Sequence, residues 1–183
     1  SYGQLLNFLA ERKDQSGIIY CLSRNSVESL ADDLRAEGFS ALPYHAGLDK
    51  QARDRHQTLF LTDEAKIIVA TIAFGMGIDK SNVRFVVHMD LPKNIESYYQ
   101  ETGRAGRDGL PSEALLFFSG GDIIKLKGFA AVEGDARQSE IMLKKLDVMA
   151  KYGDLKTCRR GFLLSYFDEE LTEDCGSWDN CTK

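Results

Sequence analysis

Short apolar runs alternate with amphipathic segments along the first two thirds of the 183-residue chain, and this alternation limits the possible folds more than any other feature. The runs are five or six residues long, and those at residues 17–22, 66–70 and 85–89 contain adjacent β-branched residues, which is typical of strands buried on both faces. Parallel strands need crossover connections, usually helices, so the sequence predicts an α/β fold with a parallel sheet and flanking helices. The predicted strands are residues 17–22, 40–44, 66–70, 85–89 and 114–118.

Helices are predicted between these strands from capping residues and from apolar residues at helical intervals. Asn25 and Glu28 have the spacing of a capping box, and Gly38 supplies a stop for the same helix. Asp49 and Asn94 can cap the two helices that follow. Ligands of such folds bind at the loops after the carboxyl ends of the strands, so we expect functional residues there.

The pattern changes after the last predicted strand, where only helical periodicity remains. Leu146 and Met149 belong to an apolar stripe on one predicted helix. We therefore expect two domains, an α/β domain over residues 1–125 and a small helical subdomain over residues 126–183.

Composition limits the kind of partner. The chain has 23 Lys and Arg against 28 Asp and Glu, a formal net charge of −5, so any contact with nucleic acid must be local. It has neither a run of 18 apolar residues nor the pattern of a secretory leader at its start. These features predict a soluble protein without a membrane partner, in the cytoplasm with the nucleoid or in a nucleus.

The densest chemical signal is the string YYQETGRAGRDG at residues 98–109, at the end of a predicted helix. Gly103 and Gly106 remove side-chain bulk beside the backbone, and the guanidinium groups of Arg104 and Arg107 match phosphate oxygens in fork geometry. A solvated basic turn is the alternative interpretation, and it is the usual one for an isolated pair of arginines three residues apart.

The whole string resembles motif VI of superfamily 2 helicases, in the form typical of the RecQ family. IIVATIAFGMGIDK at residues 67–80 resembles motif V, residues 18–26 resemble motif IV, and YHAGL at residues 44–48 resembles the motif that follows it. The resemblance implies a RecA-like, P-loop NTPase-type sheet that forms the second motor domain of an ATP-dependent DNA helicase. It also implies that the N-terminal RecA-like motor domain, which would hold most of the ATP and Mg²⁺, lies outside this chain.

Carried over to this chain, the resemblance implies an ATP-facing set of residues. Arg107 would be the arginine finger that stabilises charge on the γ-phosphate, and Arg104 and Gln100 would sense that phosphate. Gly77 and Asp79 would border the nucleotide, with Asp79 contacting the ribose or a motif VI arginine. The alternatives are a loop cap for Asp79 and a network that only fixes the loop for Arg104.

The resemblance also implies a DNA-facing set. The Thr71 hydroxyl and the amides around Ala73 would hold a single-strand phosphate without reading bases. Ser23, Arg24 and His45 follow neighbouring strands and would contact the same backbone. A lone histidine such as His45 is more often a structural residue.

Two absences complete this set of expectations. The chain has no G-x-x-x-x-G-K-[ST] phosphate loop, because Lys80-Ser81 follows Asp79 where that motif requires glycine. Residues 63–66, DEAK, imitate an Asp-Glu magnesium box but precede a strand instead of ending one. We therefore expect no ATP hydrolysis by this chain alone.

Three of the four cysteines, Cys158, Cys175 and Cys181, gather near the end of the sequence. With CRR at residues 158–160 they resemble the RecQ zinc-binding subdomain, except that Trp178 stands where that family has a fourth cysteine. Structural zinc prefers four thiolate or imidazole ligands. Asp174, Asp179 or a water could complete the shell, or Trp178 could pack as a plug beside three free thiols.

Three functions agree with these motifs. The first is an ATP-dependent helicase that moves 3′ to 5′ on single-stranded DNA and unwinds duplex DNA in repair and recombination, a polarity and role that the resemblance implies. The second is a nucleic-acid-binding module that is not coupled to ATP. The third is an RNA helicase of the same superfamily.

Overall fold

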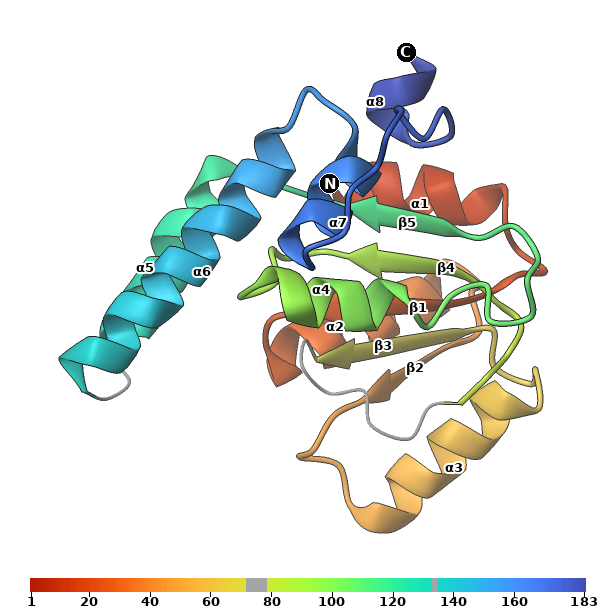
Figure 1. The fold of residues 1–183 in the computed structure, drawn as a ribbon. Coiled ribbons are helices and arrows are strands. Elements are labelled where there is room, and N and C mark those ends of the chain that lie inside the picture. The colour runs from red at the N-terminus through yellow and green to blue at the C-terminus, as the bar shows by residue number, and fades with distance from the viewer. Residues whose placement is uncertain (72–78, 133–134) are drawn as a thin grey trace. The chain divides into compact units, whose positions relative to one another are not determined.

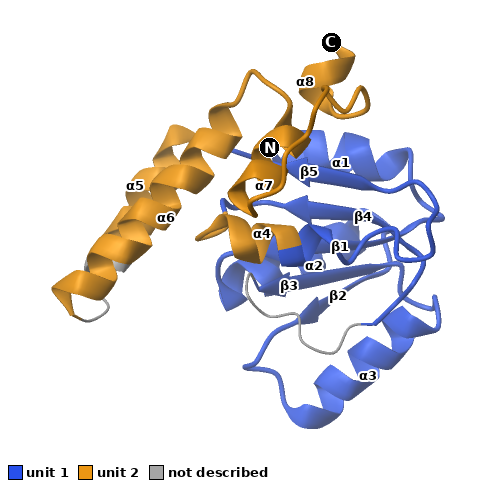
Figure 2. Cartoon of the chain, in the orientation of Figure 1, with its two compact units in different colours: residues 1–91, 100–118 blue, residues 92–99, 119–183 orange. Residues whose placement is uncertain are grey.

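The computed structural model describes residues 1–71, 79–132 and 135–183 and divides the chain into two compact units. The first, the sheet unit, consists of residues 1–91 and 100–118 (Figure 2). The second, the helical unit, consists of residues 92–99 and 119–183. The predicted boundary after residue 125 falls inside helix α5 (Gly120–Val132), and the domain boundary stays a prediction.

The sheet unit contains a five-stranded parallel sheet in the order β2-β3-β1-β4-β5 (Figure 1). All five predicted strands are confirmed, within two residues at each end. Their observed bounds are β1 Ser16–Cys21, β2 Ala41–Tyr44, β3 Ile67–Thr71, β4 Val83–His88 and β5 Glu113–Leu116.

Helices α1 (Tyr2–Ala10), α2 (Arg24–Ala36) and α3 (Lys50–Leu61) connect or precede these strands. The predicted cap of α3 is confirmed, because the Asp49 carboxylate accepts from the Ala52 amide. The predicted capping box of α2 is wrong: the helix begins at Arg24, and the Ser23 hydroxyl accepts from the Ser26 amide.

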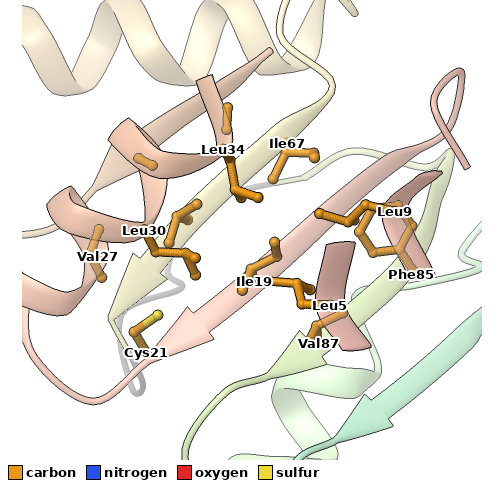
Figure 3. Close-up of a cluster of buried hydrophobic side chains, with 13 residues drawn as sticks. Leu5, Leu9, Ile19, Cys21, Val27, Leu30, Leu34, Ile67, Phe85 and Val87 are labelled. Carbon is orange, nitrogen blue, oxygen red and sulfur yellow. The ribbon is translucent and has the colours of Figure 1, made fainter. Parts of the chain in front are cut away.

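Side chains alternate between the two faces of the sheet, as a two-residue period requires. Ile19 and Cys21 of β1 face one cluster with α1 and α2, drawn in Figure 3, whereas Ile18 and Tyr20 face the other with Phe60 of α3. Each fully buried aliphatic or aromatic side chain contributes about 1.5–3 kcal/mol to folding. The sheet is therefore covered on both faces, as the strand composition predicts.

Gly17 is required by a close approach inside the first cluster. A Cβ atom on Gly17 would lie 1.9 Å from Cε2 of the Phe85 ring, which is fully buried and meets Phe8 edge to face at 5.5 Å between centroids. The ring thus occupies the space that any other side chain at position 17 would need.

The outer strands β2 and β5 have four residues each. Pro43 lies in β2. Near β5, the Arg12 guanidinium donates from Nε and Nη2 to the two Glu113 carboxylate oxygens, at 3.0 and 2.9 Å, and its Cζ lies 3.8 Å from the centroid of the Phe8 ring.

The helical unit contains α5, α6 (Ala136–Asp154), α7 (Arg159–Tyr166) and α8 (Asp179–Thr182), together with the first part of α4 (Ile95–Thr102). The Asn94 carboxamide accepts from the Ser97 amide, which confirms the predicted cap of α4. None of the described helices is long and apolar enough to cross a membrane.

Aromatic rings form much of the described core of the helical unit. Tyr152 lies 5.2 Å from Tyr98 and 6.0 Å from Phe162 between ring centroids. Leu146 and Met149 are buried beside them on α6, which confirms the predicted apolar stripe. Packing in this unit therefore depends on few, large side chains among those described.

Candidate functional site

The chain folds back into a glycine-flanked turn after α4. The Gly106 amide donates to the Val83 carbonyl at 2.9 Å, and the Asp108 amide donates to the Ser81 carbonyl at 3.1 Å. Gly106 has φ +69°, and a Cβ atom there would lie 2.6 Å from the Ser112 hydroxyl. Because Val83 begins β4, the turn lies at the amino end of that strand, away from the carboxyl edge.

An ion pair fixes the part of the turn that follows Arg107. The Arg84 guanidinium donates to the Asp108 carboxylate at 2.5 Å and to the Pro111 carbonyl at 2.9 Å. The hydrogen bond from Arg84 holds the pKa of Asp108 below its usual value. Asp108 is thus anionic at neutral pH, and the position of Arg107 between Gly106 and Asp108 is fixed on both sides.

Arg107 points to solvent from this turn. Its side chain is 43% exposed, and Nη1 donates at 3.0 Å to the Asp79 carboxylate, which is 87% exposed. An exposed ion pair contributes only about 0–1 kcal/mol, so a stronger anion can replace Asp79. The Arg107 guanidinium is therefore accessible to solvent, and its ion pair with Asp79 holds it only weakly.

Arg104 is half-buried and lies near Tyr20, which belongs to a buried polar group with His88 and Glu101. His88 stacks on Tyr20 at 5.0 Å between centroids with 22° between the planes, and its Nε2 lies 3.3 Å from the Glu101 carboxylate. Burial raises the pKa of Tyr20, and the charge of Arg104 opposes that shift. Gln100, one residue before Glu101, is exposed.

A second set of predicted residues meets at the carboxyl edge of the sheet. Since β2, β3 and β1 are parallel neighbours, the residues that end or follow them lie along one edge. Thr71 ends β3 and is half-buried, and Ser23 and Arg24, which follow β1, are exposed. Ala73 and Gly77 lie outside the described residues.

His45 is buried at this edge, and both its ring nitrogens have protein partners. The Gly47 amide donates to Nδ1 at 3.0 Å, so Nε2 carries the proton and donates at 2.8 Å to the Glu28 carboxylate. A Cβ atom on Gly47 would lie 3.0 Å from Nη1 of Arg24. His45 therefore holds the loop against α2, beside the exposed arginine.

The structure thus separates the predicted residues into two sets. Arg107 and Asp79 meet near the amino end of β4, whereas Ser23, Arg24, His45 and Thr71 line the carboxyl edge. Sequence reasoning missed Glu28 and Glu101. No local signal identifies them, because their partners His45 and His88 lie 17 and 13 residues away in the sequence.

The imitation of a magnesium box has a different role. Asp63, with φ +62°, accepts at 2.8 Å from the buried ammonium of Lys80 and at 2.9 Å from the Ser16 hydroxyl. The hydrogen bond from Lys80 lowers the pKa of Asp63 to about 2. The Asp63 carboxylate is therefore bound by Lys80 and Ser16 of the same chain, which agrees with the interpretation that residues 63–66 are not a magnesium box.

The three clustered cysteines meet in the helical unit. Sγ of Cys175 lies 3.7 Å from Sγ of Cys181, and all three sulfurs lie within 4.8 Å of one another. Tetrahedral ligands at about 2.3 Å from zinc are about 3.8 Å apart, so the donor set fits such an ion. The Cys158 sulfur accepts from the amides of Gly161 and Cys175, at 3.4 and 3.5 Å.

Backbone dipoles favour charge on one of these sulfurs. Hydrogen bonding from the Ser177 backbone, with a smaller contribution from Trp178, lowers the pKa of Cys175 to about 6. Desolvation raises the pKa of Cys181 to about 11. Trp178 is the N-cap residue of α8 without a side-chain hydrogen bond, and it is 37% exposed, so it does not form a buried plug.

Comparisons with known proteins agree with both parts of the chain. Residues 2–109 match the family model described as helicase conserved C-terminal domain, and residues 120–182 match the one described as RecQ zinc-binding. The structure of the Escherichia coli DEAD-box protein SrmB, solved with the regulator of ribonuclease activity A, is similar in fold. Its TM-score is 0.61 at 24% identity, over 69% of this chain and 74% of that one.

Two curated relatives illustrate the sequence similarity. The ATP-dependent DNA helicase RecQ of Haemophilus influenzae is 50% identical over 178 residues, 97% of this chain and 29% of its own length. A protein of Acanthamoeba polyphaga mimivirus that bears the name of an ATP-dependent RNA helicase is 45% identical over 168 residues, 92% of this chain and 31% of its own. The chain thus spans less than a third of either relative. The predicted RecA-like fold and the predicted resemblance are both confirmed, and the chain belongs to the RecQ helicase family, as its helicase C-terminal domain followed by its zinc-binding region.

Proposed function

We propose that this chain is the second motor domain of an ATP-driven helicase that moves 3′ to 5′ on single-stranded DNA and unwinds duplex DNA in repair and recombination. The observation that supports this most is the exposed Arg107, held at a fixed turn by one weak ion pair with Asp79. ATP and Mg²⁺ would be held mainly by an N-terminal RecA-like domain, and Arg107 would reach the γ-phosphate from this side.

In this role each arginine of the turn does a different task. Arg107 would stabilise the negative charge that grows on the transferred phosphoryl group, and leaving Asp79 would cost it little. Arg104, half-buried near Tyr20, would hold the turn and sense the phosphate. Gln100 and Gly77 would complete the nucleotide-facing surface.

The carboxyl edge would carry the DNA strand. The Ser23 and Thr71 hydroxyls, the Arg24 guanidinium and the Ala73 amide can bind phosphate without reading bases, as movement along any sequence requires. His45 would position this loop through Glu28 and Gly47. These few phosphate-binding groups at one edge agree with a chain whose net charge of −5 gives no overall attraction to DNA.

Cys158, Cys175 and Cys181 would hold Zn²⁺ in the helical unit. Bound there, the ion would supply a cross-link between the start of α7, the loop before α8 and α8 itself. The 3.7 Å separation between two of the sulfurs supports this assignment.

Replacing Arg107 in the complete helicase tests the proposed function. Arg107→Ala should lower DNA-stimulated kcat for ATP by about three to five orders of magnitude, since an arginine finger contributes that much. Single-strand DNA binding, measured by fluorescence anisotropy, should stay within about twofold because Arg107 lies away from the carboxyl edge. Arg55→Ala, on the exposed face of α3, is the matched control and should leave both quantities unchanged.

An unchanged kcat for Arg107→Ala would remove the arginine-finger assignment. A second candidate, an RNA helicase, is favoured by the name of the mimivirus relative. Unwinding assays with DNA and RNA substrates of one sequence, offered in competition, distinguish the DNA helicase from the RNA helicase. Stronger unwinding of the RNA would make RNA the substrate in place of DNA. Normal DNA binding with no ATP turnover in the complete protein would support the uncoupled binding module.

A further inference from the structure

The cysteine cluster of the helical unit is one donor short of a complete zinc shell. We propose that Zn²⁺ held by Cys158, Cys175 and Cys181 takes its fourth ligand from solution, and that this position accepts a small monothiol. The inference rests on the zinc binding proposed above and concerns only how the shell is completed.

The described part of the chain offers no fourth donor at the required distance. Among those residues, the group whose ligand atoms lie within 4.8 Å of one another consists of the three cysteines. The carboxylate of Asp179 is engaged elsewhere: it accepts from Nε of Arg159 at 2.8 Å, and Nζ of Lys183 lies 3.9 Å away. Asp174, although adjacent to Cys175, does not belong to the group.

Trp178 occupies the place from which the loop would supply a fourth ligand. It lies three residues after Cys175 and three before Cys181, so the loop reads C-x-x-W-x-x-C. The indole nitrogen carries a hydrogen and has no lone pair to donate, so Trp178 cannot ligate a metal. Since Trp178 is 37% exposed, it also does not bury the cluster.

The surroundings of the sulfurs admit a donor from solution. Cys175 and Cys181 are only half-buried, whereas Cys158 is 8% exposed. Thiolate is the class of donor that a soft three-thiolate site favours, and reducing compartments keep small thiols reduced. On binding, the thiol would release its proton to solvent and its sulfur would donate an electron pair to the ion, with no change of oxidation state.

Cobalt provides a spectroscopic test, because Co²⁺ in a thiolate site absorbs by sulfur-to-metal charge transfer. The purified chain is loaded with Co²⁺ and titrated with 2-mercaptoethanol, after any Cys disulfides have been reduced and the reductant removed. The band should grow by roughly one third and saturate, because three metal–sulfur bonds become four. A band that stays constant up to millimolar thiol would overturn the inference.

Two variants of one position sharpen this test. Trp178→Cys should show the larger band before any thiol is added, give no response to thiol, and keep Zn²⁺ against a chelator at least about tenfold better. Trp178→Phe removes the indole without adding a donor, so it should respond to thiol as the parent does. If Trp178→Phe no longer responds, the indole and not an open position explains the titration, and the inference fails.

The remaining outcomes separate the inference from the zinc assignment. If the chain binds one metal ion while Asp179→Asn or Asp174→Asn changes the cobalt spectrum, the fourth ligand comes from the chain itself. That result would overturn this inference but leave the proposed zinc site intact. Far less than one metal ion per chain in both the parent and Trp178→Phe would overturn the proposed zinc site itself.

Discussion

In the sheet unit, two clusters of buried side chains cover the two faces of five strands, and the backbone hydrogen bonds of the sheet join segments far apart in sequence. In the helical unit, the described core consists of a few aromatic and aliphatic side chains, with three cysteine sulfurs beside a four-residue helix. A unit of the first kind is stable through burial alone. A unit of the second kind gains from a cross-link.

Removal of a cysteine from the cluster should give the largest effect. Cys158→Ser should abolish stoichiometric zinc and the part of the stability of the helical unit that comes from zinc binding, which reaches roughly 10–16 kcal/mol in complete zinc-finger sites. Hydrogen exchange should then show lost protection in α7 and α8 but retained protection in β1 and β4. Cys21→Ala, in the sheet, is the matched control and should keep the metal.

Equal loss of protection in both units after Cys158→Ser would break the comparison, since it would mean that the sheet also depends on the cluster. Zinc analysis by mass spectrometry on the same samples shows whether the metal was lost first.

Overfilling the sheet core should give a smaller effect in the other unit. Gly17→Ala places a methyl group 1.9 Å from the buried Phe85 ring, so we expect a loss of about 3 kcal/mol in the free energy of unfolding by urea. Gly3→Ala in α1 is the matched control, because a Cβ there meets nothing within 4 Å, and it should raise stability by about 0.5–1 kcal/mol.

The zinc content of Gly17→Ala should stay at the parental value if the two units are stabilised separately. A stability for Gly17→Ala within 0.5 kcal/mol of the parent, on the order of the error of such measurements, would show that the Phe85 ring moves aside at little cost.

Removing one charge from the pair of Asp63 and Lys80 should give the smallest effect, and one that depends on pH. Asp63→Asn should cost about 1 kcal/mol at pH 7, because the Asp63 side chain is 41% exposed and solvent screens the pair. The folded pKa of Asp63, about 2, lies below its unfolded value of about 3.9. The stabilisation is therefore complete above about pH 5 and disappears as pH falls toward 2.

Urea titrations of the parent and Asp63→Asn at several pH values measure this difference. Glu64→Gln, an exposed neighbour, serves as the control. A difference that stays constant from pH 7 to pH 2 would mean that Asp63 acts through its shape and not through its charge.

The architecture could be predicted from the sequence because its signals are local. Five short apolar runs predicted the five strands, and Asp49 and Asn94 predicted two helix starts. The start of α2 was misplaced because Ser23 and Asn25 are both good capping residues, and it is the Ser23 hydroxyl that accepts from a first-turn amide, that of Ser26.

The site was predictable in its residue types but not in its partners. The string around Arg107 could be found from its spacing, whereas the pairs of His45 with Glu28 and of Lys80 with Asp63 each join residues 17 positions apart through the tertiary fold. Nothing local in the sequence indicates that the His45 ring is buried with both nitrogens engaged. Residues 72–78 of motif V, which include Ala73 and Gly77, lie outside the described residues, so their role stays a prediction.

The short outer strands have a consequence for handling the protein at high concentration. Pro43 removes a backbone donor from β2, and the Arg12 side chain places charge beside Glu113 of β5. Unpaired strand borders otherwise recruit strands of other molecules, and brevity, proline and charge all oppose that recruitment. We therefore expect the two outer strands to resist fibrous self-association of the sheet.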